Sequence, residues 1–358
     1  MADTSYGVNH PQAQKLFSKK LAHDVIGESY FGKFTGKGDS ALIQVKTETQ
    51  KDSGDKITFG LRSLLTGAGV AGDSTLEGSE EAMVNYSDSV TIDQLRHAVR
   101  SAGKMSEQRV PWSVREEARM GLKDWWIERL ETVIANQLTG NTGEGDLRYV
   151  GHNATTAPTS GRLIVGGSET AETSLSATTT HAIKLADLDK AVAIAKTAVS
   201  GGRQRIRPLK IAGKDHYVTF LHPDQIYQLR RDASTQGNLW DMLRSQLQGG
   251  DIKDNPLVTG ASFMYNNVIV HEWSYLPNTT GNAANTSYRR GVFCGAQACA
   301  LAFGQGFGPG QFDWNEELFD YKNKLGVESG LIYGAKKTVY NSVDFGTIVL
   351  AGYAPAQA

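Results

Sequence analysis

Residues 111–138 read PWSVREEARMGLKDWWIERLETVIANQL, the longest helical pattern in the sequence. Ser113 and Glu116 have the spacing of a capping box, in which both side chains accept hydrogen bonds from backbone N–H groups of the first turn. Gly140 follows the pattern and is the residue type that most often ends a helix. Apolar residues recur at steps of three and four, which predicts an amphipathic helix roughly 40 Å long at about 1.5 Å per residue. These apolar residues are Val114, Ala118, Leu122, Trp125, Trp126, Leu130, Val133, Ile134 and Leu138.

The charged residues of this helix form like-signed pairs four residues apart. Arg119 precedes Lys123, and Asp124 precedes Glu128. Like charges at this spacing destabilise an isolated helix by about 0.2–0.5 kcal/mol per pair. Two interpretations remain open: a core helix with a solvated charged face, or a helix whose charges contact another molecule.

Composition indicates a soluble globular protein, with 40% hydrophobic and 21% charged residues. A chain of 358 residues exceeds the usual size of one core, so we expect two lobes. The formal net charge of −1 argues against a dedicated nucleic-acid binder. Two cysteines, Cys294 and Cys299, indicate no disulfide framework. No apolar run approaches the length of a membrane span, and the N-terminus lacks the apolar core of a signal peptide.

The N-terminal third contains a predicted hairpin with a glycine-rich tip. Apolar residues at helical spacing predict a short helix over residues 10–31, and residues 40–49 alternate as a strand. KITFGL at 56–61 and AMVNYSDSVTI at 82–92 are extended, and the polar TGAGVAGDSTLEGSEE at 66–81 separates them. A two-stranded hairpin is not stable alone in water, so this one needs a surface to lie on. A second copy of the chain could supply that surface.

A second capping-box match, Thr91 with Gln94, predicts a helix through Arg100. After residue 140 the chain reads as extended loops with one strand in RLIVG at 162–166. Residues 185–300 read as a compact α+β lobe, with a strand pair turning at Asn266 and Asn267. The remaining tail is dominated by strands and includes the apolar run FGTIVLAG at 345–352, which predicts a buried strand.

The sequence contains no clear catalytic motif. GQGFGPG at 304–310 lacks the Lys-Ser/Thr of a phosphate-binding loop and reads as a turn. His216, His222 and His271 could form a metal site, although structural histidines are much commoner. No nucleophile elbow and no paired carboxylates are evident. We therefore predict no enzyme, no cofactor and no metal site, and keep a metal-dependent enzyme as a remote alternative.

Several stretches between about residues 15 and 350 together resemble the tailed-bacteriophage major capsid proteins of the Hong Kong 97-like fold, and specifically the major coat proteins of the coliphage N-four type. These stretches read SGDKITFGL, LEGSEEAMVNYSDSVTIDQLRHAVRSAGKMSEQRV, REEARMGLKDWWIERLE, RPLKIAGKDHYVTFLHPDQ and the closing GTIVLAG. The resemblance implies an α+β fold of five parts. They are an N-terminal arm (1–50), an extended-loop β-hairpin (51–92), a peripheral domain (93–184) with a long spine helix (113–139), an axial domain (185–300), and a return to the peripheral-domain sheet (301–358).

The resemblance also implies a function. The chain would be a major capsid protein that self-assembles into hexamers and pentamers of an icosahedral shell, enclosing phage double-stranded DNA without sequence-specific binding. Its partners would be itself, a separate scaffolding protein, a portal and, as a further option, a decoration protein, with no membrane involved. It would belong to the virion and assemble in the host bacterial cytoplasm. The alternative of the same class is the shell protein of a cellular nanocompartment.

Two sets of residues are candidate contacts between subunits. The first comprises the glycines of the hairpin tip, and the second the charges of the spine helix. They are Gly67, Gly69, Gly72 and Gly78, and Arg119, Lys123, Asp124 and Glu128.

Overall fold

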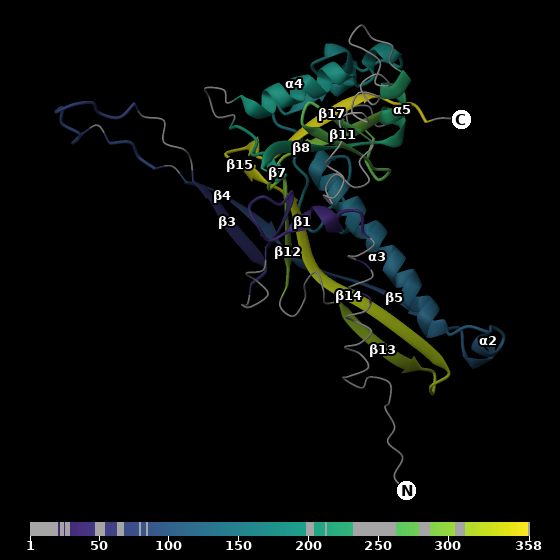
Figure 1. The fold of residues 1–358 in the computed structure, drawn as a ribbon. Helices are drawn as coiled ribbons and strands as arrows, with labels where there is room; N and C mark the ends of the chain where they lie inside the picture. The colour runs from purple at the N-terminus through teal and green to yellow at the C-terminus, as the bar shows by residue number, and fades with distance from the viewer. Residues whose placement is uncertain are drawn as a thin grey trace.

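The computed structural model describes residues 21, 25, 29–46, 54–62, 68–78, 80–83, 85–197, 204–211, 213–231, 263–278, 287–304 and 312–356. Two sheets, one long helix and a projecting hairpin organise this part of the chain (Figure 1). The predicted helix at residues 10–31 lies largely outside the described residues, although Leu21 and Val25 are helical and fully buried.

The long helix α3 spans Val114–Thr139, within one residue of the predicted spine helix. Ser113 is the N-cap residue with extended backbone, but its side chain makes no capping hydrogen bond, so the predicted capping box is wrong. Gly140 ends the helix in the left-handed conformation, with φ 62° and ψ 47°. A Cβ atom at this position would lie 2.5 Å from the backbone oxygen of Thr156, so the close approach requires glycine.

The first sheet has the strand order β1-β2-β12-β14-β13, with β5 paired to the other edge of β14. α3 packs on one face of this sheet, where the Trp126 ring lies 5.1 Å from Phe312 and its indole N–H donates to the Ser329 hydroxyl. The strands are β1 (Thr35–Gly36), β2 (Ile43–Lys46), β5 (Asp93–Arg100), β12 (Cys299–Phe303), β13 (Asp313–Phe319) and β14 (Lys324–Lys337).

The helix predicted from Thr91 to Arg100 is wrong, because Thr91 is the last residue of strand β4 (Asn85–Thr91) and residues 93–100 form strand β5. β5 pairs antiparallel with β14 over its whole length. Leu95 packs against the main core, and the next residue on the same face, His97, stacks on Trp125 at 4.5 Å. Pairing of the whole strand with β14 outweighs the local capping pattern.

The second sheet has the strand order β6-β17-β11-β8-β10-β9, with β7 paired to β8. Helices α4 (Leu185–Lys196) and α5 (Pro223–Arg231) share one apolar cluster with this sheet. Both Asn266 and Asn267 have positive φ in the turn between β9 and β10, as predicted. The strands are β6 (Leu163–Val165), β7 (Leu209–Ile211), β8 (Lys214–Leu221), β9 (Phe263–Tyr265), β10 (Val268–Glu272), β11 (Tyr288–Cys294) and β17 (Thr347–Tyr353).

Strand β17 is fully paired and almost entirely buried, which confirms the buried strand predicted at its position. It lies between β6 and β11 in the second sheet. The resemblance implied that residues 301–358 return to the sheet of the peripheral domain, which is the first sheet, where α3 packs. Only β12, β13 and β14 of the tail join the first sheet. The lobe built on the second sheet therefore includes residues on both sides of the predicted range 185–300.

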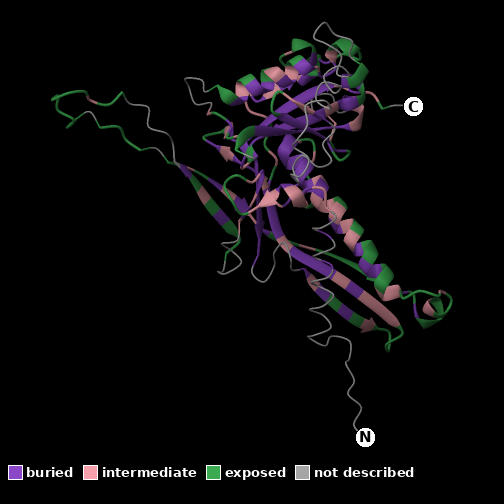
Figure 2. Cartoon of the chain, in the orientation of Figure 1, coloured by how far each residue is buried: buried purple, intermediate pink, exposed green. Residues whose placement is uncertain are grey.

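The predicted hairpin is present. Strand β3 (Lys56–Arg62) pairs antiparallel with β4 (Asn85–Thr91), and the pair projects from the body with an exposed loop at its end (Figures 1 and 2). The remaining described elements are short. They are η1 (Gly32–Phe34), α2 (Lys104–Gln108), η3 (Leu147–Tyr149), η4 (Gly166–Ser168), η5 (Glu172–Ser174), η6 (Thr179–His181), β15 (Val339–Tyr340) and β16 (Val343–Asp344).

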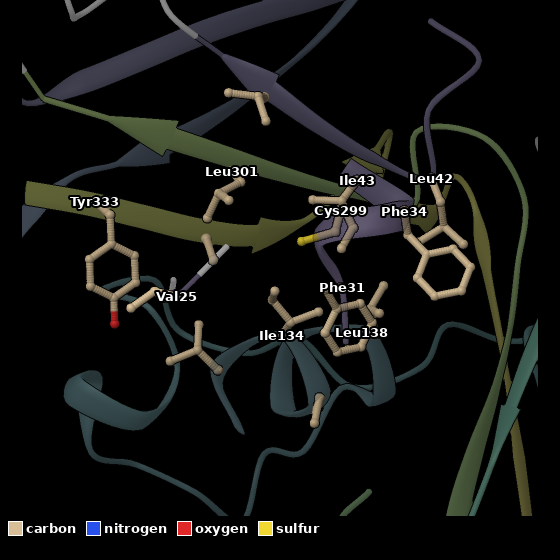
Figure 3. Close-up of a cluster of buried hydrophobic side chains, with 14 of the residues drawn as sticks. Val25, Phe31, Phe34, Leu42, Ile43, Ile134, Leu138, Cys299, Leu301 and Tyr333 are labelled. Atoms are coloured by element: carbon tan, nitrogen blue, oxygen red, sulfur yellow. The ribbon is translucent and has the colours of Figure 1, made fainter. Parts of the chain in front are cut away.

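The main apolar core lies where the N-terminal segment, α3 and the first sheet meet (Figure 3). Phe31 and Phe34 enter it from the N-terminal segment, Ile134 and Leu138 from α3, and Tyr333 from β14. All five are buried. Among the described residues, no helix is both long and apolar enough to cross a membrane.

Candidate assembly surfaces

The loop of the projecting hairpin is exposed and acidic. Described residues within 68–83 include Asp73, Glu77, Glu80 and Glu81, and this stretch of sequence contains no lysine or arginine. The apolar side chains of Leu76 and Met83 are also exposed. The loop therefore presents four carboxylates and two apolar side chains to solvent, with no basic residue beside them.

The candidate glycines in this loop take the conformation for which glycine is suited. Gly69, Gly72 and Gly78 have φ values of 70°, 67° and 88°, and a Cβ at any of them would meet no atom within 4 Å. They therefore shape the loop and are not packed against the body of their own subunit. Gly67 lies outside the described residues.

The base of the hairpin is fixed to the first sheet. Buried Asp88 forms an ion pair with Lys336 and accepts a hydrogen bond from Val339 N–H at 3.0 Å. The Asn153 side chain bonds both the N–H and the carbonyl of Thr91, each at 2.9 Å. A rigid base below an exposed loop makes the hairpin an arm that reaches away from its own subunit.

The four candidate charges of α3 do not share one environment. Asp124 is exposed, with 75% of its side chain accessible, and Glu128 is also exposed. Lys123 is largely covered, and its Nζ lies 4.0 Å from Asp124. Arg119 is only 9% exposed, so its expected place on the solvent face is wrong. The reason is helical geometry, because Arg119 shares a face with Leu122 and Trp126, three and seven residues further on.

A second exposed surface, which we call the distal tip, lies at the far end of the molecule from the hairpin loop (Figure 1). It consists of α2, the start of α3 and the turn between β13 and β14. The side chains of Met105, Trp112 and Tyr321 are exposed there. Asp320, Tyr321 and Lys322 all have positive φ, between 50° and 69°, which is a strained conformation for non-glycine residues.

Sequence reasoning missed the distal tip. Trp112 falls within the stretch 111–138 that predicts the long helix, and Tyr321 falls within a tail predicted to consist mainly of strands. The exposed Pro111-Trp112 dipeptide immediately before the helix was the available signal.

The junction between α3 and both sheets is built from buried ion pairs. Arg290 on β11 pairs with Glu172 through two bonds of 2.7 and 2.6 Å, and it also donates to the carbonyl of Gly140 at 2.8 Å. Lys337 on β14 lies 2.8 Å from Asp344, and both are 1% exposed. Burial lowers the pKa of Lys337, and the neighbouring Asp344 carboxylate opposes that shift. These pairs tie the C-terminal end of α3 to both sheets.

The histidines do not form a metal site. His216 and His222 lie near opposite ends of β8, so their Cα atoms are roughly 20 Å apart at about 3.3 Å per residue. His271 is buried beside the aromatic rings of Phe34 and Phe220. The described residues contain no group of three or more potential ligands that could hold a metal ion. His216 and His222 are therefore too far apart to share one metal ion in this structure.

Comparison with known proteins gives full-length matches. A family profile described as "Phage capsid protein" matches residues 5–356. The chain is 26% identical over 364 residues to the major capsid protein of Pseudomonas phage KPP25, covering 94% of each. It superposes on the capsid of Ralstonia phage GP4 with a TM-score of 0.80 and 30% identity over 100% of both chains. The chain shares its fold with the capsid asymmetric unit of cyanophage Pam1, with a TM-score of 0.72. The two are 21% identical, and the match covers 93% of this chain and 94% of the Pam1 chain.

Proposed function

This chain belongs to the phage capsid protein family, and from that premise we propose that it assembles into the hexamers and pentamers of an icosahedral shell around phage double-stranded DNA. Its α+β fold is the Hong Kong 97-like fold that the sequence predicted. The observation that carries the proposal is the match to the Ralstonia phage GP4 capsid, at 30% identity over the full length of both chains. The family match favours a phage shell over that of a cellular nanocompartment.

Assembly in this proposal depends on contacts between different surfaces of identical subunits. The acidic hairpin loop and the distal tip lie at opposite ends of the molecule, so neither can contact the other within one subunit (Figure 1). Contacts between unlike surfaces build closed rings when the rotation between subunits closes. Many weak contacts of this kind add up across a shell. The lobe of the second sheet, with α4 and α5, serves as the axial domain at the centre of each ring.

The exposed charges of the spine helix form a further contact with a neighbouring subunit. Asp124 and Glu128 offer accessible carboxylates, and Lys123 lies beside them. The proposed contact leaves out Arg119, which is only 9% exposed.

The remaining partners follow from the shell function. A separate scaffolding protein guides assembly in the host cytoplasm, a portal occupies one vertex, and a decoration protein is a further option. The shell itself has a structural role without catalysis. Its net charge of −1 suits a container that does not bind its DNA tightly.

Electron microscopy of the chain expressed with the other head proteins of its phage tests the proposal. We expect closed shells from the unmodified chain, and folded subunits without normal shells after deletion of residues 67–78. A second variant replaces the four acidic residues of the loop by Asn or Gln. It keeps the length of the loop and removes its negative charge, so it tests whether charge or length is needed for assembly. The four residues are Asp73, Glu77, Glu80 and Glu81. Absence of both shells and rings from the unmodified chain would refute the shell function. Normal shells from the deletion variant would refute only the role of the hairpin.

A further inference from the structure

Arg129 on α3 packs its guanidinium against two aromatic rings. The guanidinium carbon lies 3.8 Å from the centre of the Tyr149 ring and 5.1 Å from the centre of the Trp125 ring. The Nε and Nη1 atoms of Arg129 are buried and have no hydrogen-bond partner among the described residues. Arginine carries a permanent positive charge, and cation–π contacts offset only part of the cost of burying it. The in-plane N–H groups of Arg129 therefore still require an acceptor.

Two further buried polar groups adjoin Arg129. The Tyr333 side chain is fully buried, and its hydroxyl points away from β14 (Figure 3). Burial raises the pKa of Tyr333, and the Arg129 guanidinium opposes that rise, so the two groups lie close enough to interact. The His152 ring packs edge-on against the Tyr333 ring, with 5.3 Å between the ring centres. In the part of the chain that the structure describes, neither the Tyr333 hydroxyl nor His152 Nε2 has a hydrogen-bond partner.

All three groups can donate a hydrogen bond at neutral pH. Burial lowers the pKa of His152, and the Asp93 carboxylate, 3.8 Å from Nδ1, opposes that shift. The ring is therefore neutral at pH 7, and Nε2 can carry its proton. A buried water molecule makes about three hydrogen bonds and carries no charge. An anion accepts a bond from every donor and also balances the charge of Arg129, so an anion suits this set of donors better.

We propose that Arg129, His152 and Tyr333 bind one small monovalent anion, of the size of chloride, where α3, β14 and the loop after η3 meet. The guanidinium supplies the positive charge. The Tyr333 hydroxyl and His152 Nε2 donate the hydrogen bonds that fix the position of the anion. The Asp93 side chain, 72% exposed beside the other nitrogen of His152, disfavours a larger and more highly charged anion such as phosphate.

Thermal unfolding of the unassembled subunit at constant ionic strength tests the site, with sodium chloride replaced stepwise by sodium gluconate, whose anion is much larger. Tyr333→Phe keeps the ring and removes the hydroxyl, so it measures the non-specific effect of the two salts. The rise in melting temperature with chloride should be larger in the unmodified chain, by about 2 °C or more at a hundredfold excess over the dissociation constant. Arg148→Met removes an exposed arginine of the neighbouring loop and should keep the full effect. Equal chloride dependence in the unmodified chain and Tyr333→Phe would overturn the proposal.

Anomalous diffraction from crystals of the subunit grown in sodium bromide separates an anion from an ordered water. We expect a bromide peak within about 3.5 Å of both the Tyr333 hydroxyl and the Arg129 guanidinium. Density at this position without an anomalous signal would identify a water molecule and refute the anion site. This measurement uses the unmodified chain, so it decides the question even if Tyr333→Phe does not fold.

Hydrogen exchange locates the effect of the anion. The loop that carries His152 continues to Asn153, whose side chain bonds the N–H and the carbonyl of Thr91 at the base of the hairpin, each at 2.9 Å. Chloride should therefore slow exchange of amides 147–153 and of Thr91, while β8 and β10 in the second sheet keep their rates. A uniform change across the subunit would indicate a general salt effect and would contradict the site. All three experiments use the unassembled subunit, so failure of the proposed shell function would leave their results unaffected.

Discussion

Replacing Arg290 by Met should destabilise the subunit more than almost any other single change. The Arg290 guanidinium is 3% exposed and makes paired bonds of 2.7 and 2.6 Å with Glu172. A third donor bonds the carbonyls of Thr139 and Gly140, at 3.3 and 2.8 Å, and so satisfies the end of α3. Methionine preserves most of the side-chain volume and removes every one of these bonds.

The expected loss follows from what remains after the substitution. Glu172 would stay 7% exposed without its cation, and breaking a buried pair in this way costs about 3–5 kcal/mol. Each carbonyl left without a donor adds about 1 kcal/mol. Typical domains are stable by about 5–15 kcal/mol, so a loss of this size in Arg290→Met should remove a large part of the free energy of unfolding.

Urea unfolding of the unassembled subunit measures this loss, with fluorescence of the six tryptophans as the signal. Arg148→Met is the matched control, because Arg148 forms an exposed pair with Asp146 and its removal should leave the midpoint unchanged. The double variant Arg290→Met, Glu172→Met should recover part of the stability, since it leaves no buried charge unpaired. A loss below about 1 kcal/mol in Arg290→Met, or no recovery in the double variant, would refute the reasoning.

Three further predictions concern assembly, the helix end and pH. Asp124→Lys combined with Glu128→Lys should reduce shell yield in micrographs and leave the melting temperature unchanged, whereas a large drop in melting temperature would favour a purely internal role. Gly140→Ala should lower stability by about 1–3 kcal/mol in urea unfolding, because alanine is strained at φ 62° and its Cβ would meet a backbone oxygen; an unchanged midpoint would contradict this. Burial lowers the pKa of His152 and His222, so the unfolded chain binds protons more readily as pH falls below about 6.5. Stability should therefore decrease from pH 7 to 5.5, by at most about 1.4 kcal/mol per pH unit for each histidine, and equal midpoints at both pH values would refute it.

The parts of the fold that depend on local pattern could be predicted from the sequence. The spine helix is 26 residues long, has regular apolar spacing and ends at a glycine. Its predicted bounds, 113–139, therefore agree with the observed bounds to within one residue. The hairpin followed from alternating residues on either side of a glycine-rich stretch. Strand β5 could not be predicted, because Leu95 is placed by its pairing with Leu331, more than two hundred residues later.

The exposed residues of the candidate assembly surfaces could be predicted only on α3, where the position of a residue around the helix decides whether it faces solvent. Asp124 and Glu128 lie on the solvent side of α3, as expected, while Arg119 lies beside the buried stripe. The distal tip depends on tertiary structure, because Tyr321 becomes exposed only where β13 turns back into β14. No local pattern in the sequence distinguishes such a tyrosine from a core residue.

The position of β17 has a consequence for how the chain is made. This strand lies between β6 and β11, yet it follows every other strand of its sheet in the sequence. β6 therefore waits for more than 180 residues of synthesis before it gains its partner. The second sheet can therefore be completed only after the hairpin, the spine helix and the distal tip have been synthesised. A chain that stops before β17 leaves β6 unpaired and one edge of β11 open, and an open strand edge is a site for wrong pairing with other chains.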